Sequence, residues 1–404
     1  MTKSPIDRLQ DTNRFAEIWW DSSPLVFGAW RDELVAAVPD ERKGELRQQL
    51  DRLIDPAGGP DASFRGCTTN PPLSLIAVKS DPARWNKRID HLADLNPGAD
   101  AATLAWMLYK EVIQSGADAF RPLYDASGGR YGFVSGQLDP RLSTEADTML
   151  AQAREISALA PNVMVKVPAS TQGIEALRAV TAEGIPTNVT TCFTVPQVMA
   201  AAKAAQEGLA IAAKNGVDTA RWRAVITLML ARLTERPALV EQARERKIEL
   251  SPADLKLFGL AVFKRSYRLL RDGGYPSKLL LCSVRPGPVV AGRLAFWDIE
   301  HVAGGDIVYT LPPFALTPMF RMGDSLDFRS DAIDQPVPAE SLERVLQTPY
   351  GIQSYDPNGM SRDQFDLHPA TVFTVAEFTK SATGLEDYVA GRLAERSAWQ
   401  GSSR

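Results

Sequence analysis

Short apolar segments alternate along this chain with longer stretches in which apolar residues recur every three or four positions. The short segments predict eight strands, over residues 17–24, 64–73, 131–139, 163–170, 185–190, 222–229, 278–285 and 305–312. The longer stretches predict helices over residues 5–16, 29–54, 81–117, 143–159, 171–184, 196–214 and 371–394, with two more inside 236–272. Strands that alternate with helices form a parallel sheet, and eight of them can close into a (β/α)8 TIM barrel.

The alternative architecture is an open, doubly wound sheet. Such sheets commonly bind dinucleotides through a Gly-x-Gly-x-x-Gly turn, and no such turn follows the first strand of this sequence. We therefore favour the barrel, as a single domain over residues 1–404 with additional helices and loops. Residues 56–60 predict a loop, residues 320–370 a long loop or capping elaboration, and residues 395–404 a frayed tail.

Composition and charge narrow the class of protein further. The chain has 404 residues, 45% of them hydrophobic and 23% charged, which is ordinary for a globular protein with a large core. A net charge of −4 predicts no nucleic-acid partner. The lack of a long early apolar run predicts neither a signal peptide nor a membrane partner, so we expect a cytoplasmic protein. Three scattered cysteines and three scattered histidines predict neither a disulfide framework nor a histidine-built metal site.

The most informative residue is Lys166, in the middle of the apolar strand 163–170. A parallel strand of this kind is buried on both faces. Burial lowers the pKa of an ammonium group, and the neutral amine is the form that attacks a carbonyl to make a Schiff base. The alternative is that Lys166 lies at the strand end with its ammonium group in water.

Polar residues gather at the C-terminal ends of the predicted strands, where barrel enzymes carry their chemistry. They are Asp21, Thr68, Asn70, Gln137, Asp139, Asn188, Thr190, Thr227, Ser283 and Arg285. Hydroxyls, amides and a carboxylate around a lysine suit a polyhydroxylated carbonyl compound, because each sugar hydroxyl needs a fixed donor or acceptor. Taken singly, each has an ordinary alternative: a helix cap for Asp21, a core amide for Gln137, a surface ion pair for Arg285.

Three segments resemble the signature segments of the transaldolase family. They are Thr68-Thr69-Asn70-Pro71-x-Leu73, Val165-Lys166-Val167-Pro168-Ala169-(x)3-Gly173-Ile174 and Gly184-Ile185-x-x-Asn188-Val189-Thr190. The stretch Leu138–Ser143 is also similar to the one that follows the catalytic acid of that family. The resemblance extends more loosely from Asp21 to the closing helix near residue 390. It implies a barrel enzyme that moves a dihydroxyacetone unit between sugar phosphates without a metal or a cofactor, and it implies a homodimer.

The resemblance also implies catalytic roles for single residues. Lys166 is the expected Schiff-base lysine. Asp21 matches the carboxylate that handles the proton of the sugar hydroxyl during carbon–carbon cleavage. Thr190 matches the hydroxyl that orients a catalytic water.

Binding roles follow from the same resemblance. Asn70 and Asn188 match the amides that hold the dihydroxyacetone end of the substrate. Arg232 and Arg285, with Ser283, match the phosphate cradle, and guanidinium groups suit a phosphate because each offers paired donors to its oxygens. The remaining expected substrate contacts are the strand-end hydroxyls of Thr68 and Thr227.

Two positions depart from the family pattern. Gln137 stands where transaldolases carry a glutamate that works through the catalytic water, and an amide cannot take up a proton. The related fructose-6-phosphate aldolases also have glutamine there, but they pair it with a tyrosine on the sixth strand, where this chain has Met229. Three hypotheses follow: a transaldolase-like transferase, an aldolase-like lyase that releases the three-carbon unit, and a sugar-phosphate-binding protein without turnover.

Overall fold

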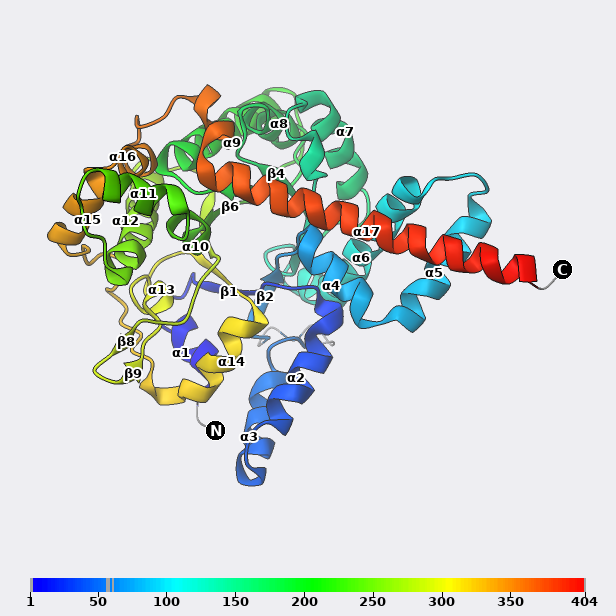
Figure 1. Ribbon diagram of the computed structural model, residues 1–404, viewed down its shortest axis with the longest axis horizontal. Helices are drawn as coiled ribbons and strands as arrows, with labels where there is room; N and C mark the ends of the chain where they lie inside the picture. Colours follow the sequence, from blue (N-terminus) through cyan, green and yellow to red (C-terminus); the bar gives the residue numbers. More distant parts are fainter. Residues whose placement is uncertain (1–2, 56–58, 60–61, 403–404) are drawn as a thin grey trace.

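The centre of the molecule is a closed barrel of eight parallel strands, seen in a computed structural model that describes residues 3–55, 59 and 62–402 (Figure 1). The barrel strands are β1 (Glu17–Trp20), β2 (Phe64–Cys67), β3 (Phe133–Gln137), β4 (Val163–Pro168), β5 (Thr187–Cys192), β6 (Ala224–Met229), β7 (Lys278–Cys282) and β10 (Val308–Leu311). They pair in the order β1-β10-β7-β6-β5-β4-β3-β2, and β2 pairs with β1. The closed order confirms the (β/α)8 barrel and excludes the open sheet.

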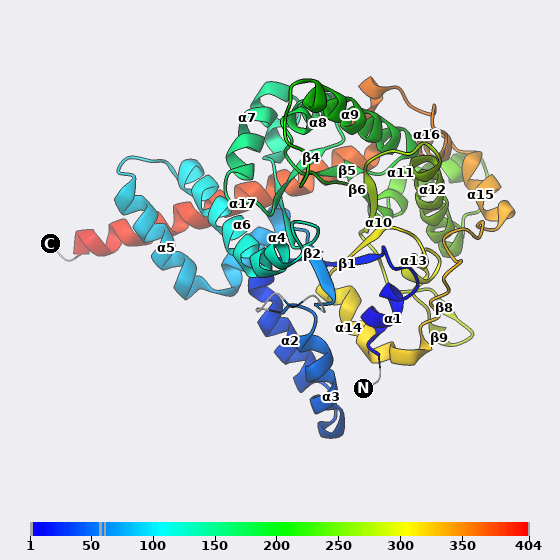
Figure 2. The ribbon, with the colours of Figure 1, turned by 180° about the vertical axis from the view of Figure 1, so that it is seen from behind.

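Helices surround the barrel and fill the connections between its strands (Figures 1 and 2). They are α1 (Pro5–Gln10), α2 (Phe27–Ala36), α3 (Asp40–Asp51), α4 (Pro71–Ser80), α5 (Pro82–Leu95), α6 (Ala101–Ala126), α7 (Ala146–Ser157), α8 (Thr171–Ala182), α9 (Val195–Lys214), α10 (Leu230–Thr234), α11 (Pro237–Glu245), α12 (Pro252–Asp272), α13 (Trp297–Glu300), α14 (Pro313–Met322), α15 (Ala339–Leu346), α16 (Pro349–Tyr355) and α17 (Pro369–Ser402). A small hairpin of β8 (Val289–Val290) and β9 (Arg293–Leu294) lies outside the barrel sheet.

Alternation along the strands decides which side chains enter the barrel. On β3, a Cβ atom at Gly136 would lie only 2.8 Å from Ile156 of α7, so Gly136 faces the helices. Its neighbour Gln137 therefore faces the barrel interior. Gln137 is in register with Lys166, and Lys166 is in register with Asn188. All three side chains consequently point into the barrel at the same level.

A buried ion cluster occupies the barrel near the N-terminal ends of the strands. The Glu17 carboxylate pairs with Arg223 and, at 3.0 Å, with Lys278, and it accepts a 3.1 Å hydrogen bond from the Trp19 indole. Lys278 also contacts Asp306 at 2.7 Å. Burial alone would raise the pKa of Glu17, but the charges of Arg223 and Lys278 outweigh it and hold that pKa below its ordinary value.

The helices differ from the sequence-based prediction at identifiable positions. The expected helix 29–54 is two helices, α2 and α3, because Pro39 disfavours a helical residue before it. The expected helix 81–117 is α5 and α6, separated near Gly98, whose φ of 87° suits glycine. The paired prolines 71–72 begin α4 instead of fixing a turn, since proline fits the first turn of a helix.

The C-terminal part of the chain is more helical than the sequence predicts. Within residues 320–370 lie the end of α14 and all of α15 and α16. The last helix, α17, crosses in front of the barrel in Figure 1 and behind it in Figure 2. Residues 395–402, expected to fray, continue α17, because ion pairs such as Arg392–Asp90 hold it against α5. Residues 403–404 and most of the predicted loop 56–60 lie outside the described residues.

Candidate active site

Lys166 lies inside the barrel with only 1% of its surface exposed. Its Nζ donates a 3.1 Å hydrogen bond to the carbonyl oxygen of Thr69, which follows β2, two strands away from β4 in the barrel. Burial lowers the pKa of Lys166 below its ordinary value, although the negative charge of Asp21 acts in the opposite direction. A lysine with its head in water is therefore excluded. The arrangement enlarges the fraction of neutral amine, which is the nucleophilic form.

Asp21 follows β1 directly and faces the same space. Its Oδ1 accepts a 2.7 Å hydrogen bond from Thr68, whose hydroxyl also lies 2.5 Å from that of Thr310. The Cys282 thiol lies 3.9 Å from Oδ2. Burial raises the pKa of Asp21, while the positive charge of Lys166 and the Thr68 hydrogen bond act to lower it. Asp21 and Lys166 are thus close enough to influence each other's protonation.

Asn188 is held in place by two hydroxyl groups. Its Nδ2 donates to Ser135 on β3 at 2.9 Å, and its Oδ1 accepts from Thr227 on β6 at 2.6 Å. These bonds fix the orientation of the amide next to Lys166. Asn188 and Thr227 are therefore brought together as the sequence predicts, and Ser135 joins them.

Two buried polar atoms beside Lys166 have no hydrogen-bond partner in the described part of the chain. They are Oε1 of Gln137, which is level with Lys166, and the hydroxyl of Thr190, which is two residues beyond Asn188 on β5. Buried polar atoms are normally paired, so an orphan atom needs an explanation. Two such orphans on either side of the lysine mark a polar space fit for a substrate hydroxyl.

Asn70 caps a helix, a role that the sequence analysis did not predict. Its Oδ1 accepts a 2.9 Å hydrogen bond from the backbone N–H of Leu73 and so caps the N-terminus of α4. The preceding residue, Thr69, donates its hydroxyl to the carbonyl of Ser135 at 2.5 Å and offers its own carbonyl to Lys166. The hydrogen bonds of Thr69 and Asn70 therefore hold in place the backbone carbonyl to which Lys166 donates.

Arg232 on α10 lies at the edge of the same site. Burial raises the pKa of Asp21 and lowers that of Lys166; the charge of Arg232 opposes the first shift and adds to the second. The guanidinium forms an ion pair with Glu377 of α17 and a weak 3.4 Å contact with the hydroxyl of Thr374. The predicted phosphate ligand is thus placed near the lysine, but it already has a carboxylate partner.

Of the other two predicted cradle residues, Ser283 bonds to the residue before Arg232, and Arg285 lies beside Glu235. Ser283 has a φ of 58°, uncommon for a residue with a side chain, and its carbonyl accepts the backbone N–H of Ala231 at 3.1 Å. This bond connects the end of β7 to the start of α10. Arg285 follows, with its side chain 3.4 Å from Glu235 and its backbone N–H donating to Asp298 at 2.7 Å.

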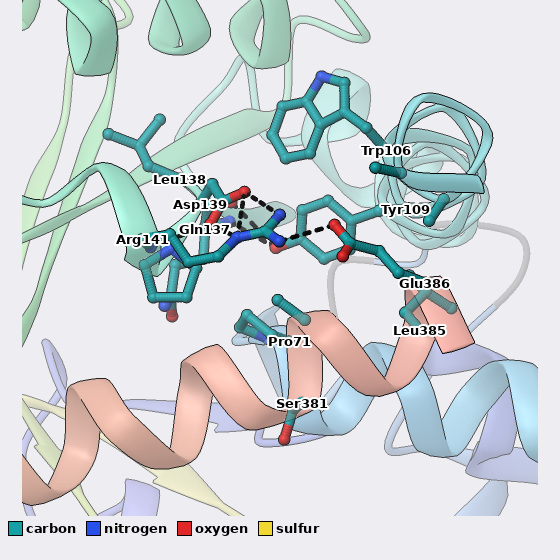
Figure 3. Close-up of a pocket in the computed structure, with 14 residues that line it drawn as sticks. Pro71, Trp106, Tyr109, Gln137, Leu138, Asp139, Arg141, Ser381, Leu385 and Glu386 are labelled. Carbon is teal, nitrogen blue, oxygen red and sulfur yellow. Dashed lines mark hydrogen bonds and ion pairs between the residues drawn. The ribbon is translucent and has the colours of Figure 1, made fainter. Parts of the chain in front are cut away.

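A small cavity of about 40 Å³ adjoins Gln137 between β3, α6 and α17 (Figure 3). Arg141 spans it from Asp139 to Glu386 of α17, with contacts of 2.6 and 2.7 Å. On the α6 side, the Tyr109 hydroxyl donates to the Gln137 carbonyl at 3.0 Å. The Asp139–Arg141 stretch therefore connects the end of β3 to the helix that crosses the barrel.

Sequence reasoning missed several residues that shape the site. Ser135 lies four positions before the end of the predicted strand 131–139 and is near a strand end only in β3 as observed. Thr310 carries a detectable signal, because it is a hydroxyl two positions from the end of the predicted strand 305–312. Glu377 and Thr374 have none, since they lie on the predicted final helix with no chemistry of their own. Only the fold brings that helix to the barrel mouth.

The described residues show neither a metal-binding cluster nor a membrane-spanning helix. Among them, no group of three or more His, Cys, Asp or Glu side chains is arranged to hold a metal ion. Within the same part of the chain, none of the helices combines the length and apolar character needed to cross a membrane.

Comparison with known proteins gives the family. A sequence profile described as transaldolase/fructose-6-phosphate aldolase matches residues 57–349. The chain is 30% identical over 284 residues to a transaldolase of Saccharopolyspora erythraea, a match that covers 68% of this chain and 75% of the relative. It is 35% identical over 170 residues to transaldolase 1 of Streptomyces coelicolor, covering 42% of this chain and 44% of that relative. The match to a Kocuria rhizophila transaldolase, 31% identical, spans about half of each chain.

The profile match includes the lysine strand, Gln137, Asn188 and both cradle arginines, whereas Asp21 and all of α17 fall outside it. The matched stretch thus covers barrel strands β2 to β7 and β10, whereas β1 and the helix that pairs with Arg232 lie outside it. On the extent of these matches, the chain belongs to the transaldolase/fructose-6-phosphate aldolase family.

Proposed function

We propose that this protein is a transaldolase-like transferase that moves a dihydroxyacetone unit between sugar phosphates through a Schiff base on Lys166. The observation that carries the proposal is the burial of Lys166, which lowers its pKa, with its Nζ in a barrel lined by hydroxyls and amides. Family membership supports the same class of reaction.

The residues suit each step of that reaction. The neutral amine of Lys166 adds to the ketose carbonyl, and loss of water together with uptake of one proton from solvent gives the iminium ion. The carbon–carbon bond two atoms along then breaks: its electron pair flows into the iminium ion to give an enamine, and the proton of the adjacent hydroxyl passes to Asp21. The aldose leaves, and the enamine attacks a second aldehyde, whose oxygen takes up the proton. Water finally hydrolyses the new iminium ion and frees Lys166.

Asn188 and Gln137 would serve this sequence by position. Asn188, fixed by Ser135 and Thr227, presents its amide to the hydroxyls of the three-carbon unit. Gln137 can orient a hydroxyl or a water molecule through its free Oε1 but cannot exchange a proton with it. Glutamine at this position, as in the fructose-6-phosphate aldolases, favours a second candidate, a lyase that releases the three-carbon unit to water, whereas Met229 disfavours it.

The experiment is intact-mass analysis after incubation with fructose 6-phosphate and borohydride, which reduces the Schiff base to a stable amine. A three-carbon adduct on the wild type, absent from Lys166→Ala, is the expected result. A six-carbon adduct alone would mean that the imine forms without cleavage, and no adduct with any ketose would overturn the enzyme. Release of free dihydroxyacetone in the absence of an acceptor aldehyde would favour the lyase.

A further inference from the structure

Both arginines of the proposed phosphate cradle are already matched by carboxylates. Arg232 pairs with Glu377, and Arg285 lies 3.4 Å from Glu235. The cavity of about 210 Å³ beside Arg285 is lined by two cationic side chains, Arg285 and Lys256, and by two anionic ones, Glu235 and Asp298. The walls around the cradle therefore carry no net positive charge.

The contact with Arg232 is the tighter of the two. Glu377 lies on α17, and two other residues of that helix, Thr374 and Phe378, also lie near the Arg232 guanidinium. Thr374 approaches the same guanidinium nitrogen at 3.4 Å, and the Phe378 ring lies 5.3 Å from the guanidinium carbon. The Arg232 side chain is 22% exposed in this setting, against 40% for Arg285. Glu377 is thus presented to Arg232 by a helix packed against the barrel.

A phosphate group that approaches Arg232 must deal with this carboxylate. It can displace Glu377, which costs the existing ion pair, or it can bind to the remaining guanidinium nitrogens and face a like charge at close range. The Glu377 side chain is 45% exposed, so solvent screens part of this repulsion, but like charges at close range still change affinity several-fold. An unphosphorylated sugar meets neither cost, because its hydroxyls can accept from Arg232 and donate to Glu377 together.

We propose that Glu377 is a specificity-determining residue that weakens the binding of a phosphate group and shifts the site toward unphosphorylated sugars. The inference rests on the proposed function only in taking Arg232 as the residue that meets the sugar's far end. It concerns a residue outside the stretch shared with the family profile, which ends at residue 349.

The test compares wild type with Glu377→Gln, which keeps the shape of the side chain and removes its charge. The first measurement is the half-saturating concentration for borohydride trapping of Lys166, taken with fructose 6-phosphate and with fructose. The second is calorimetric titration with inorganic phosphate, which needs no turnover. Asp387→Asn is the matched control, because Asp387 is an exposed carboxylate on the same helix, about 15 Å further along the axis. Glu235→Gln tests the looser pair.

In Glu377→Gln, fructose 6-phosphate and inorganic phosphate should bind about tenfold more tightly, equivalent to removing about 1.4 kcal/mol of repulsion, with fructose unchanged. Glu235→Gln should give a smaller gain and Asp387→Asn none. Unchanged or weaker phosphate binding in a folded Glu377→Gln protein would overturn the inference, since Glu377 would then be neutral or would help to hold Arg232 for the phosphate. If wild type traps no ketose, the proposed function fails, and the inorganic phosphate titration still decides the role of Glu377.

Discussion

At the scale of single residues, the most consequential feature of the site is that the side chain facing Lys166 from β3 is the amide of Gln137, which cannot transfer a proton as a carboxylate would. Gln137 is 3% exposed, and its Oε1 has no partner in the described part of the chain. An amide in this place can accept a hydrogen bond but cannot take a proton from a water molecule or return it. The slow steps of a Schiff-base cycle are those that need such transfers, namely imine formation and hydrolysis.

Gln137→Glu should therefore raise the rate of three-carbon transfer from fructose 6-phosphate to an aldose phosphate acceptor. Positioned general acid–base groups commonly contribute a factor of about 10²–10⁴, so we expect a gain of at least about tenfold even with imperfect placement. Steady-state transfer kinetics measure it. Gln137→Ala is the control, because it removes the amide without supplying an acid. Equal rates for the Glu and Ala variants would show that proton transfer at this position does not limit turnover.

At the scale of secondary-structure elements, the barrel strands could be predicted because most of them, such as β4 and β6, are short apolar runs in a sheet buried on both faces. The lysine strand is β4, and Ser170 caps α8 as its sequence suggests, by accepting the N–H of Gly173 at 2.9 Å. The hairpin β8–β9 and the short helix α10 could not be predicted in this way. They are too short for a periodic pattern, and their conformation depends on tertiary contacts.

The same limit applies to the site. Strand ends converge in any parallel barrel, so the predicted neighbours of Lys166 follow from topology once the strands are known. Partners that come from α17 do not follow, because the direction in which a C-terminal helix crosses a barrel is decided by side-chain packing along its whole length. The Arg232–Glu377 pair is therefore visible only in three dimensions.

The N-terminal layer of the barrel offers a test of stability. Glu17 is 4% exposed and joins β1 to β6 and β7 through Arg223 and Lys278. Removing one partner of a buried ion pair costs about 3–5 kcal/mol. We expect Glu17→Gln to lose about 3 kcal/mol of unfolding free energy at pH 7, the lower end of that range because Lys278 keeps Asp306. Urea unfolding measures the loss, with the exposed Glu33→Gln as the control.

The loss should depend on pH in a defined direction. Because the folded state holds the pKa of Glu17 below its ordinary value of 4.5, its contribution is complete above that value. The contribution declines as the pH falls through the lowered pKa, where the folded protein also takes up the proton. The difference between wild type and Glu17→Gln should therefore be constant near neutral pH and shrink below about pH 4.5. A difference that grows on acidification would contradict the assigned direction.

At the scale of the whole molecule, α17 connects the mouth of the barrel to its periphery. It contacts β5, α10, α6, α4 and α5 in turn. Near the mouth one face of the helix is buried, as for Phe378 at 0% exposure, and Glu377 and Glu386 pair with Arg232 and Arg141. Beyond that, its contacts with α5 are polar. Tyr388 donates to Asn86 at 2.8 Å, followed by the arginine pairs near the end of the helix.

This difference in contacts predicts that the end of α17 that packs on α5 can be loosened without changing the end at the barrel mouth. In the double variant Arg392→Ala/Arg396→Ala, the pairs with Asp90 and Asp94 are lost. Both pairs are partly exposed, and such pairs contribute about 0.2–1 kcal/mol each, so the unfolding free energy should fall by less than about 2 kcal/mol. Hydrogen exchange should accelerate in the last three turns of α17 and in α5. Exchange around Phe378 should stay as in wild type.

Trapping of Lys166 is the readout that separates the ends, because it depends on the mouth alone. We expect the double variant to trap ketoses within about twofold of wild type, since nothing that contacts Arg232 or Arg141 is altered. Phe378→Ala is the opposing control: a buried phenylalanine truncated to alanine costs about 3–5 kcal/mol and loosens the segment that holds Glu377, so its half-saturating ketose concentration should shift by more than about twofold. If the double variant changed ketose trapping while Phe378→Ala left it as in wild type, the distal end of α17 would control the site, and the prediction would be wrong.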